Sequence, residues 1–314
     1  MIDRPWRLIF MGTPEFARPS LRALLEAGQE VLAVVTQPDR RCGRGRKLSM
    51  PPIKEEAQAW GVPVWQPPRV RQQEVVRALA ELHPELIVVV AFGQLLPAEV
   101  LTIPSVGALN VHASLLPRHR GPAPINWAII QGNSVTGVTI MWMDAGMDTG
   151  PIFLTEAVKI TEADTAGSLT ARLASLGAEL LLQALNKLQQ GEIIRQPQPM
   201  EGISYAPPLT RQMQHLDFDR PAMEVARWVR GLDPRPGAFA TYQGKTLKVF
   251  QARVAQESGD LAPPGTVLQV TNRGAEVACG QGSVWLPEVQ LAGSRRMPAQ
   301  EFARGHLLVN QRLG

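Results

Sequence analysis

The run Leu86-Ile87-Val88-Val89-Val90-Ala91 constrains the fold more than any other feature of this 314-residue chain. Its residues are all apolar and mostly β-branched, and they do not alternate with polar ones. A strand of this kind is typical of a parallel sheet that helices cover on both faces, whereas a half-exposed strand alternates. The run therefore predicts an α/β domain.

Strand-like and helix-like segments alternate through the first part of the chain. Further strands are expected at Leu8–Met11, Val31–Thr36, Ala108–His112 and Val135–Met143. Helices are expected at Ser20–Ala27, Pro52–Trp60, Gln72–Leu82, from Pro124 onward, and at Thr165–Gln190. This alternation predicts a Rossmann-like, mostly parallel sheet with helices on both faces. Gly12-Thr13-Pro14 after the first strand is no GxGxxG fingerprint, so we expect no dinucleotide.

The pattern changes near Gly191. The segment 191–208 is rich in proline and is expected to form a semi-extended linker. Short strand-like runs with intervening turn residues follow the helix expected at Ala222–Arg230: Ala238–Tyr242, Thr246–Val254, Thr266–Val270, Ala275–Ala278 and Val284–Val289. Such runs favour a small OB-like β-barrel. We therefore expect a catalytic domain at 1–190, a linker at 191–208 and a second domain at 209–314.

Charge and cysteine content narrow the class of protein. Net charge is +4, and it comes from the C-terminal part, because residues 209–314 hold 13 basic and 9 acidic side chains. A basic domain suits a polyanionic partner, although charge alone more often describes a soluble basic surface with no partner. Cys42 and Cys279 form no metal-binding spacing, and no apolar run is long enough to span a membrane. These features predict a cytoplasmic protein with no metal, no membrane partner and no export signal.

Two strand ends carry side chains with possible chemistry. Asn110 and His112 lie two residues apart, so both point to one face of the expected strand. An amide and an imidazole at the carboxyl end of such a strand can hold a developing oxyanion and move protons. A lone Asn-x-His is more often incidental. Asp144 and Asp148 follow the next strand, where either can orient the imidazole or simply form a turn, and their spacing does not choose between them.

Several strings, in order along nearly the whole chain, resemble the methionyl-tRNA formyltransferases. They are FMGTPEFA (10–17), QPDR (37–40), AFGQLLP (91–97), NVHASLLPRHRGPAPI (110–125), MDAGMDTGPI (143–152) and VRGLDPRPGA (229–238). The first half alone resembles the wider group of folate-dependent formyltransferases. The resemblance implies a Rossmann-like domain followed by an OB-like barrel, and a protein that we expect to be a monomer.

The resemblance also implies site residues and substrates. The family's catalytic residues fall on Asn110, His112 and Asp148, and its reduced-folate contact falls on Ser114, Leu115, Leu116 and Pro117. The implied donor is 10-formyltetrahydrofolate, and the implied acceptor is the α-amino group of initiator methionyl-tRNA. We expect the amine to attack the formyl carbon while Asn110 and His112 hold the oxygen and Asp148 orients His112.

RNA contacts are expected in two places. Residues 39–47 hold five basic side chains and two glycines, which describes either a solvated loop or an RNA-binding one. The resemblance favours RNA, with Arg44 at the family's key arginine and Arg40, Arg46 and Lys47 assisting. Arg295 and Arg296 are the best candidates in the C-terminal domain. Pro208 stands where relatives usually have a lysine, so no RNA contact is assigned to the linker.

Two other functions compete with this interpretation. A formyltransferase acting on a small amine, such as an amino sugar nucleotide, would have the same first half, but the basic segment 39–47 and the basic C-terminal domain argue against it. A non-catalytic RNA-binding protein on the same fold would not need Asn110, His112 and Asp148.

Overall fold

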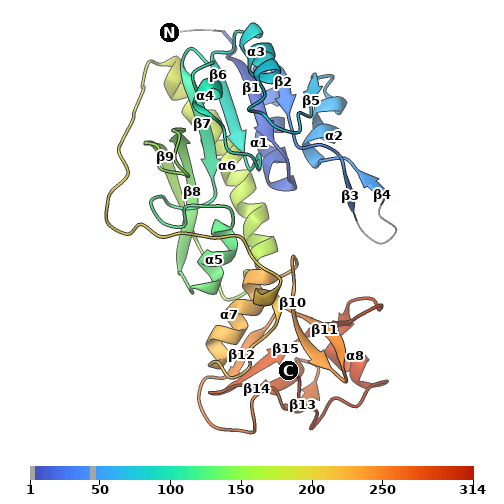
Figure 1. Ribbon diagram of the computed structural model, residues 1–314. Helices are drawn as coiled ribbons and strands as arrows, with labels where there is room; N and C mark the ends of the chain where they lie inside the picture. The colour runs from blue at the N-terminus through green and yellow to red at the C-terminus, as the bar shows by residue number, and fades with distance from the viewer. Residues whose placement is uncertain (1–3, 43–46) are drawn as a thin grey trace. The chain divides into compact units, whose positions relative to one another are not determined.

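The computed structural model describes residues 4–42 and 47–314, which form two compact units (Figure 1). The first unit consists of Met1–Pro124, Thr136–Val158 and Thr170–Ala206. The second consists of Ile125–Val135, Lys159–Leu169 and Pro207–Gly314. The functional division of the chain at 191–208 stays a prediction. No helix in the described part of the chain is both long and apolar enough to cross a bilayer.

A seven-stranded sheet in the order β5-β2-β1-β6-β7-β8-β9 forms the centre of the first unit. Its strands are β1 (Arg7–Gly12), β2 (Glu30–Val35), β5 (Val64–Trp65), β6 (Leu86–Val90), β7 (Gly107–His112), β8 (Val135–Trp142) and β9 (Ile152–Lys159). Neighbours from β5 to β7 pair in parallel, and β7 pairs with β8 antiparallel. The predicted mostly parallel sheet is therefore confirmed.

Helices cover both faces of this sheet. They are α1 (Arg18–Glu26), α2 (Pro52–Ala59), α3 (Gln73–Glu81), α4 (Ala98–Leu101) and α6 (Ala166–Gln189), with a 3-10 turn η1 (Glu15–Ala17). On one face, Ile87 and Val89 of β6 pack with Leu79 of α3. On the other, Gly177 of α6 lies so close to β7 that a Cβ there would come within 2.8 Å of the Val111 side chain. Residues that alternate with Val111 therefore face away from α6.

Several parts of the first unit differ from expectation, and the short elements β5 and α4 were not predicted. Strand β9 was not predicted, because only Ile152 and Phe153 are buried and the rest lacks an apolar pattern. The basic segment, expected to be a loop, is bounded by two short antiparallel strands, β3 (Arg40–Cys42) and β4 (Lys47–Ser49). A high arginine content does not distinguish a loop from a pair of strands. The pairing of β3 with β4 could therefore not be predicted from composition.

The second unit holds two antiparallel sheets, in the orders β10-β11-β16-β17 and β12-β15-β14-β13. Their strands are β10 (Ala238–Tyr242), β11 (Lys245–Phe250), β12 (Arg253–Gln256), β13 (Val267–Thr271), β14 (Gly274–Ala278), β15 (Ser283–Leu286), β16 (Glu288–Leu291) and β17 (Met297–Pro298). The helical elements are α5 (Pro124–Ile130), η2 (Gln212–Gln214), α7 (Ala222–Leu232) and α8 (Ala299–Ala303). The OB-like closure of these sheets stays a prediction.

Two long strands expected in this unit are each divided. Thr246–Val254 breaks at Gln251, which has φ 56, and its backbone N–H donates to Asp233 Oδ2 at 2.9 Å instead of to a neighbouring strand. Val284–Val289 breaks at Pro287, which has no N–H for a ladder bond. The two breaks let consecutive residues enter different sheets around one core. Val225 and Val229 of α7 contribute to that core.

Candidate active site

Strand β7 places two of the expected side chains together. Asn110 and His112 lie on the face turned away from α6, and both are buried, with 9% and 6% of their surface exposed. They sit at the carboxyl end of a strand between parallel β6 and antiparallel β8. Alternation along the strand thus brings an amide and an imidazole to one side of the sheet end, as the spacing predicts.

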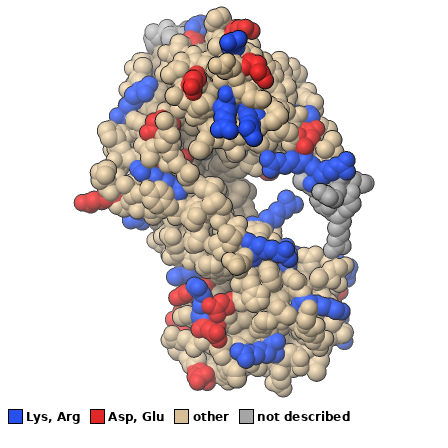
Figure 2. Space-filling model, viewed as in Figure 1, with Lys and Arg blue, Asp and Glu red and all other residues tan. Residues whose placement is uncertain are grey.

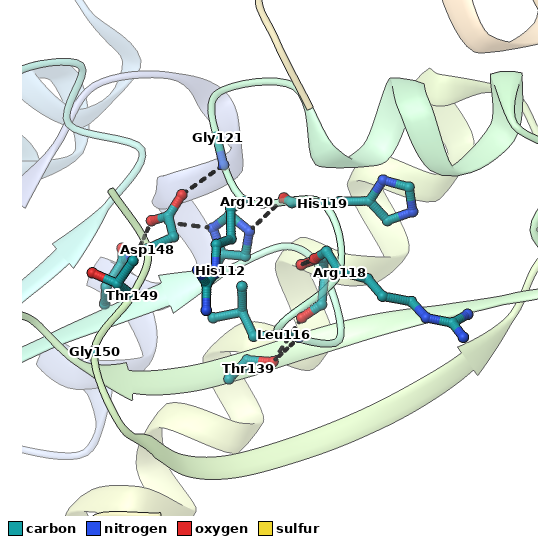
Figure 3. A network of polar contacts seen from close by, with 12 residues as sticks. His112, Leu116, Arg118, His119, Arg120, Gly121, Thr139, Asp148, Thr149 and Gly150 are labelled. Carbon is teal, nitrogen blue, oxygen red and sulfur yellow. Dashed lines mark hydrogen bonds and ion pairs between the residues drawn. The ribbon is translucent and has the colours of Figure 1, made fainter. Parts of the chain in front are cut away.

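Asp148 approaches both of these side chains from the loop between β8 and β9, and Figure 3 shows its contact with His112. Its Oδ1 lies 3.6 Å from His112 Nδ1 and 3.5 Å from Asn110 Nδ2. Its Oδ2 accepts a hydrogen bond of 2.7 Å from the backbone N–H of Gly121. One carboxylate oxygen of Asp148 is therefore held by Gly121, and the other is directed at Asn110 and His112.

The imidazole of His112 lies between two acceptors (Figure 3). Its Nε2 is 3.1 Å from the carbonyl oxygen of His119, and because a carbonyl oxygen only accepts, this contact requires a proton on Nε2. The 3.6 Å between Nδ1 and Asp148 Oδ1 is too long for a strong hydrogen bond, and with Nε2 protonated this contact is attractive only when Nδ1 also carries a proton. The ring orientation is thus set by both contacts.

The other acid of the loop has a different role. Asp144 Oδ1 accepts from the backbone N–H of Gly146 at 3.0 Å and from the Thr149 hydroxyl at 2.7 Å. These are turn-forming contacts within one loop. Of the two acids between which spacing did not choose, Asp148 is the one beside His112. In the described residues, no group of three or more His, Cys, Asp or Glu side chains could hold a metal ion.

The segment Ser114–Pro117 follows β7 and turns its polar groups inward. Ser114 is fully buried, and its hydroxyl donates to the carbonyl oxygen of Arg118 at 2.6 Å. The hydroxyl of Thr139 in β8 donates to Ser114 O at 2.7 Å and accepts from Leu116 N at 3.2 Å. Leu115 keeps part of its side chain exposed. Any ligand would therefore meet the backbone and Leu115 rather than the Ser114 hydroxyl.

Sequence reasoning missed several residues that hold this site. Gly121 supplies the N–H to Asp148, and Thr139 fastens the segment after β7. Arg120 and Gln198 bond to each other, and Gln198 also reaches the Asp148 loop. Arg120 and Gly121 lie within the string at 110–125 that carries the resemblance, so a signal was present for them. Gln198 lies in the expected linker, where no pattern marks it.

The basic hairpin is described only in part. Arg40 is exposed at the start of β3, and its guanidinium donates to Gln37 Oε1 at 3.2 Å. Arg44 and Arg46 lie outside the described residues, as does the side chain of Lys47. Just before the hairpin, Asp39 accepts from Gln66 at 2.7 Å and from Lys54 at 2.8 Å. These hydrogen bonds hold the pKa of Asp39 below its usual range.

Arg295 and Arg296 lie in different surroundings. The Arg296 guanidinium stacks 3.9 Å from the Phe250 ring centre and pairs with Glu288 and, at 3.6 Å, with Asp233. Arg295 is 78% exposed and pairs with Glu301 at 2.9 Å. Basic side chains are spread over the face shown in Figure 2 and do not gather in one patch. On the face shown, charge alone therefore does not mark an RNA-binding region.

Comparison with known families decides the relationship. Residues 6–185 match the formyl transferase family, and residues 208–307 match the formyl transferase C-terminal domain. The chain belongs to the formyltransferase family. It is 49% identical over 300 residues to a protein of Pelotomaculum thermopropionicum named methionyl-tRNA formyltransferase, covering 95% of each chain. A protein of the same name from Pelobacter propionicus is 51% identical over 298 residues, covering 95% of this chain and 92% of that one. The family resemblance drawn from the sequence is confirmed.

Solved structures share the fold at low identity. HypX from Aquifex aeolicus, in complex with tetrahydrofolic acid, has a TM-score of 0.66 at 21% identity and covers 96% of this chain and 47% of its own. An N-formyltransferase from Helicobacter canadensis, bound to folinic acid and dTDP-3-aminofucose, has a TM-score of 0.66 at 18% identity and covers 93% and 100%. These likenesses support the predicted order of a mostly parallel sheet followed by antiparallel strands.

Proposed function

We propose that this chain transfers a formyl group from 10-formyltetrahydrofolate to the α-amino group of methionine on initiator tRNA, giving the N-formylmethionyl-tRNA used in translation initiation. The observation that carries this function is the extent of the likeness. Relatives named methionyl-tRNA formyltransferase are 47–51% identical over about 95% of this chain, which includes the C-terminal unit as well as the site. The structure that contains an amino sugar nucleotide is only 18% identical and supports the fold alone.

The arrangement at the end of β7 suits acyl transfer to an amine. The donor supplies an activated formyl carbon. A free α-amine has a pKa of about 8, so a useful neutral fraction exists near neutral pH without a strong base. The Asn110 amide has a second N–H besides the one directed at Asp148, and the His112 ring can donate through Nδ1 when that nitrogen is protonated. Together they can hold the oxygen that becomes negative as the amine attacks. Asp148, 3.6 Å from the imidazole, orients it and assists proton transfer from the amine to the folate nitrogen, which leaves as its bond to the formyl carbon breaks.

Residues 114–117 can contact a folate only through some of their groups. The hydroxyl of Ser114 donates to Arg118 O and the backbone N–H of Leu116 donates to Thr139 of β8, so both donors are already used. We therefore assign the contact to the remaining backbone groups and to the exposed part of Leu115, with Ser114 and Thr139 holding the segment in shape. Binding would depend on this shape more than on any one polar side chain.

The proposed RNA contacts fall into two groups. The hairpin at 40–49 would engage the acceptor end through Arg44, with Arg40, Arg46 and Lys47 adding charge. In the C-terminal domain, exposed Arg295 is the better phosphate ligand, because Arg296 already pairs with two carboxylates and stacks on a ring. In this division, residues 1–190 carry the chemistry and residues 209–314 add affinity for the tRNA.

Three acceptors supplied with the same labelled folate donor test the proposal. We expect label in methionyl initiator tRNA, and none in uncharged tRNA or in a dTDP-amino sugar. Transfer to the amino sugar at a comparable rate would support the small-amine alternative. The absence of transfer to any acceptor, with tRNA still bound, would support a non-catalytic RNA-binding protein.

A further inference from the structure

We propose that Gln198 is a positioning residue that holds the loop of Asp148 in the geometry needed for turnover, and that Arg120 fixes the orientation of Gln198. This inference rests on the proposed function, because it concerns the same site. Gln198 lies in the segment expected to be a linker, 48 to 50 residues along the chain from the loop that it contacts.

The amide of Gln198 makes four contacts with the site. Its Nε2 donates to the backbone carbonyl oxygens of Asp148 and Gly150, each at 2.8 Å. Its Oε1 accepts from Arg120, at 3.1 Å from Nε and at 2.7 Å from a terminal nitrogen. Since carbonyl oxygens only accept and a guanidinium only donates, the amide can take only one of its two orientations. These four hydrogen bonds therefore fix the Gln198 amide in one orientation and form a brace between Arg120 and the Asp148 loop.

Asp148 needs such a brace because of its backbone. Its φ is 54, in the left-handed region that residues other than glycine rarely adopt. Gln198 holds the backbone carbonyl of Asp148, and the Gly121 N–H holds the Oδ2 of its side chain. With both ends fixed, Oδ1 is left directed at His112 Nδ1. A shift of the loop would move Oδ1 of Asp148 away from the His112 imidazole.

Arg120 connects the brace to the other loop of the site. Its side chain is buried, and its backbone bonds on both sides to the chain after Gln198, through Ser204 O at 2.9 Å and Ala206 N at 2.7 Å. The next residue, Gly121, is the one that donates to Asp148. Arg120 therefore ties the Asp148 loop, the loop after β7 and residues 198–206 into one unit.

Gln198→Glu tests the role with the smallest change. It preserves the side-chain length and the acceptors toward Arg120, but it removes both donors and places a carboxylate oxygen against two carbonyl oxygens. We expect kcat to fall about 10- to 100-fold, since small misplacements of catalytic groups have effects of this size. KM for the folate donor and for methionyl-tRNA should change by less than about twofold, because no substrate contact is removed.

Gln196→Glu is the matched control. The same chemical change is made two residues away, at an exposed side chain whose backbone pairs with Ile152. Its kcat should stay within about twofold of the unmodified chain. Thermal unfolding of both variants shows whether either has lost its fold. If Gln198→Glu does not fold, Gln198→Met, which removes all four contacts without adding charge, should show the same loss of kcat.

A double-variant cycle separates positioning from general support. If Gln198 acts through Asp148, adding Gln198→Glu to Asp148→Asn should lower kcat by less than about threefold, because the group that is positioned has already been lost. The inference would be overturned if Gln198→Glu lowered kcat as much in the Asp148→Asn background as in the unmodified chain. It would also be overturned if Gln198→Glu raised KM without lowering kcat, or left kcat normal. Normal turnover in Asp148→Asn alone would instead overturn the proposed role of Asp148, and this inference with it.

Discussion

Gly121 shows how much one residue without a side chain contributes to the site. Its N–H donates to Asp148 Oδ2, its φ is 119, and a Cβ there would lie 2.8 Å from the carbonyl oxygen of Ala206. Neither the backbone conformation nor the space suits another residue. Because the contacted atom belongs to the backbone, a side chain cannot be accommodated by a rotamer change. The backbone at Gly121 or at Ala206 would have to move, and with it the N–H that holds Asp148.

Gly121→Ala should therefore affect both stability and turnover. We expect a loss of about 1–3 kcal/mol in the free energy of unfolding and a fall in kcat. Gly191→Ala is the control, because Gly191 also has a positive φ of 84 but has nothing within 4 Å of a Cβ. It should cost about 1 kcal/mol and leave kcat unchanged. Urea unfolding and steady-state rates measure both, and equal effects at the two positions would contradict the close contact at Gly121.

Arg295→Ala and Arg296→Ala should differ in their effects on stability and on tRNA binding. Burial raises the pKa of Asp233, while the Gln251 N–H and the Arg296 charge oppose that rise. Removing Arg296 takes away this charge and the stacking on Phe250, and should cost about 1–2 kcal/mol of unfolding free energy. Arg295→Ala should cost less than about 0.5 kcal/mol, since an exposed pair adds little, yet weaken tRNA binding. The reverse ranking in urea unfolding would contradict these assignments.

At the scale of elements, Glu85 joins the starts of two central strands. Glu85 lies directly before β6. Its carboxylate accepts hydrogen bonds from the Arg4 guanidinium at 2.8 and 2.5 Å and from the backbone N–H of Arg7 in β1 at 3.1 Å. The Arg4 hydrogen bonds are the main cause that lowers the pKa of Glu85, and the Arg7 N–H adds to it, while burial opposes both. The junction between β1 and β6 therefore depends on an ionised carboxylate.

The junction should weaken in acid. A lowered folded pKa means that the stabilisation is fully present above the ordinary glutamate pKa of about 4.3 and is lost as the pH falls through the lower folded value. Glu85→Gln should therefore be less stable than the unmodified chain at neutral pH, and the difference should shrink below about pH 4. Urea unfolding across this range measures it. A difference that is constant with pH would contradict an electrostatic role.

The sequence predicted the elements with regular apolar patterns best. The strands expected at 8–11, 86–91 and 108–112 occur within about one residue of their observed ends, because buried strands show their burial directly in sequence. Strand β9 was missed because it is mostly exposed. The breaks at Gln251 and Pro287 were missed because a continuous apolar pattern does not reveal where consecutive residues change sheets.

Part of the site followed from local spacing, and part did not. The shared face of Asn110 and His112 follows from alternation along β7. The choice of Asp148 over Asp144 did not follow from spacing, because it depends on the turn around Asp148 and on Gly121 from another loop. Gln198 had no local signal at all, since each of its partners lies far away in the sequence.

At the scale of the whole molecule, a polyanionic substrate should make the reaction sensitive to salt. Arg44→Leu should weaken methionyl-tRNA binding and reduce the slope of log affinity against log salt by roughly one, as expected for the loss of one phosphate contact. Affinity for the folate donor should stay within about twofold. Binding measured at about 50 to 200 mM salt checks this. Equal losses for tRNA and folate would indicate a folding defect and contradict a specific RNA contact.

The proposed mechanism requires that Asp148, rather than Asp144 of the same loop, acts beside His112. The single-turnover rate of formyl transfer to methionyl initiator tRNA, compared between Asp148→Asn and Asp144→Asn, tests it directly. At both positions asparagine keeps one acceptor oxygen for the backbone, removes the charge and replaces the other oxygen by an NH2 group. We predict a fall of about 100-fold or more for Asp148→Asn and less than about threefold for Asp144→Asn. Equal rates in the two variants, or the larger fall in Asp144→Asn, would contradict the account.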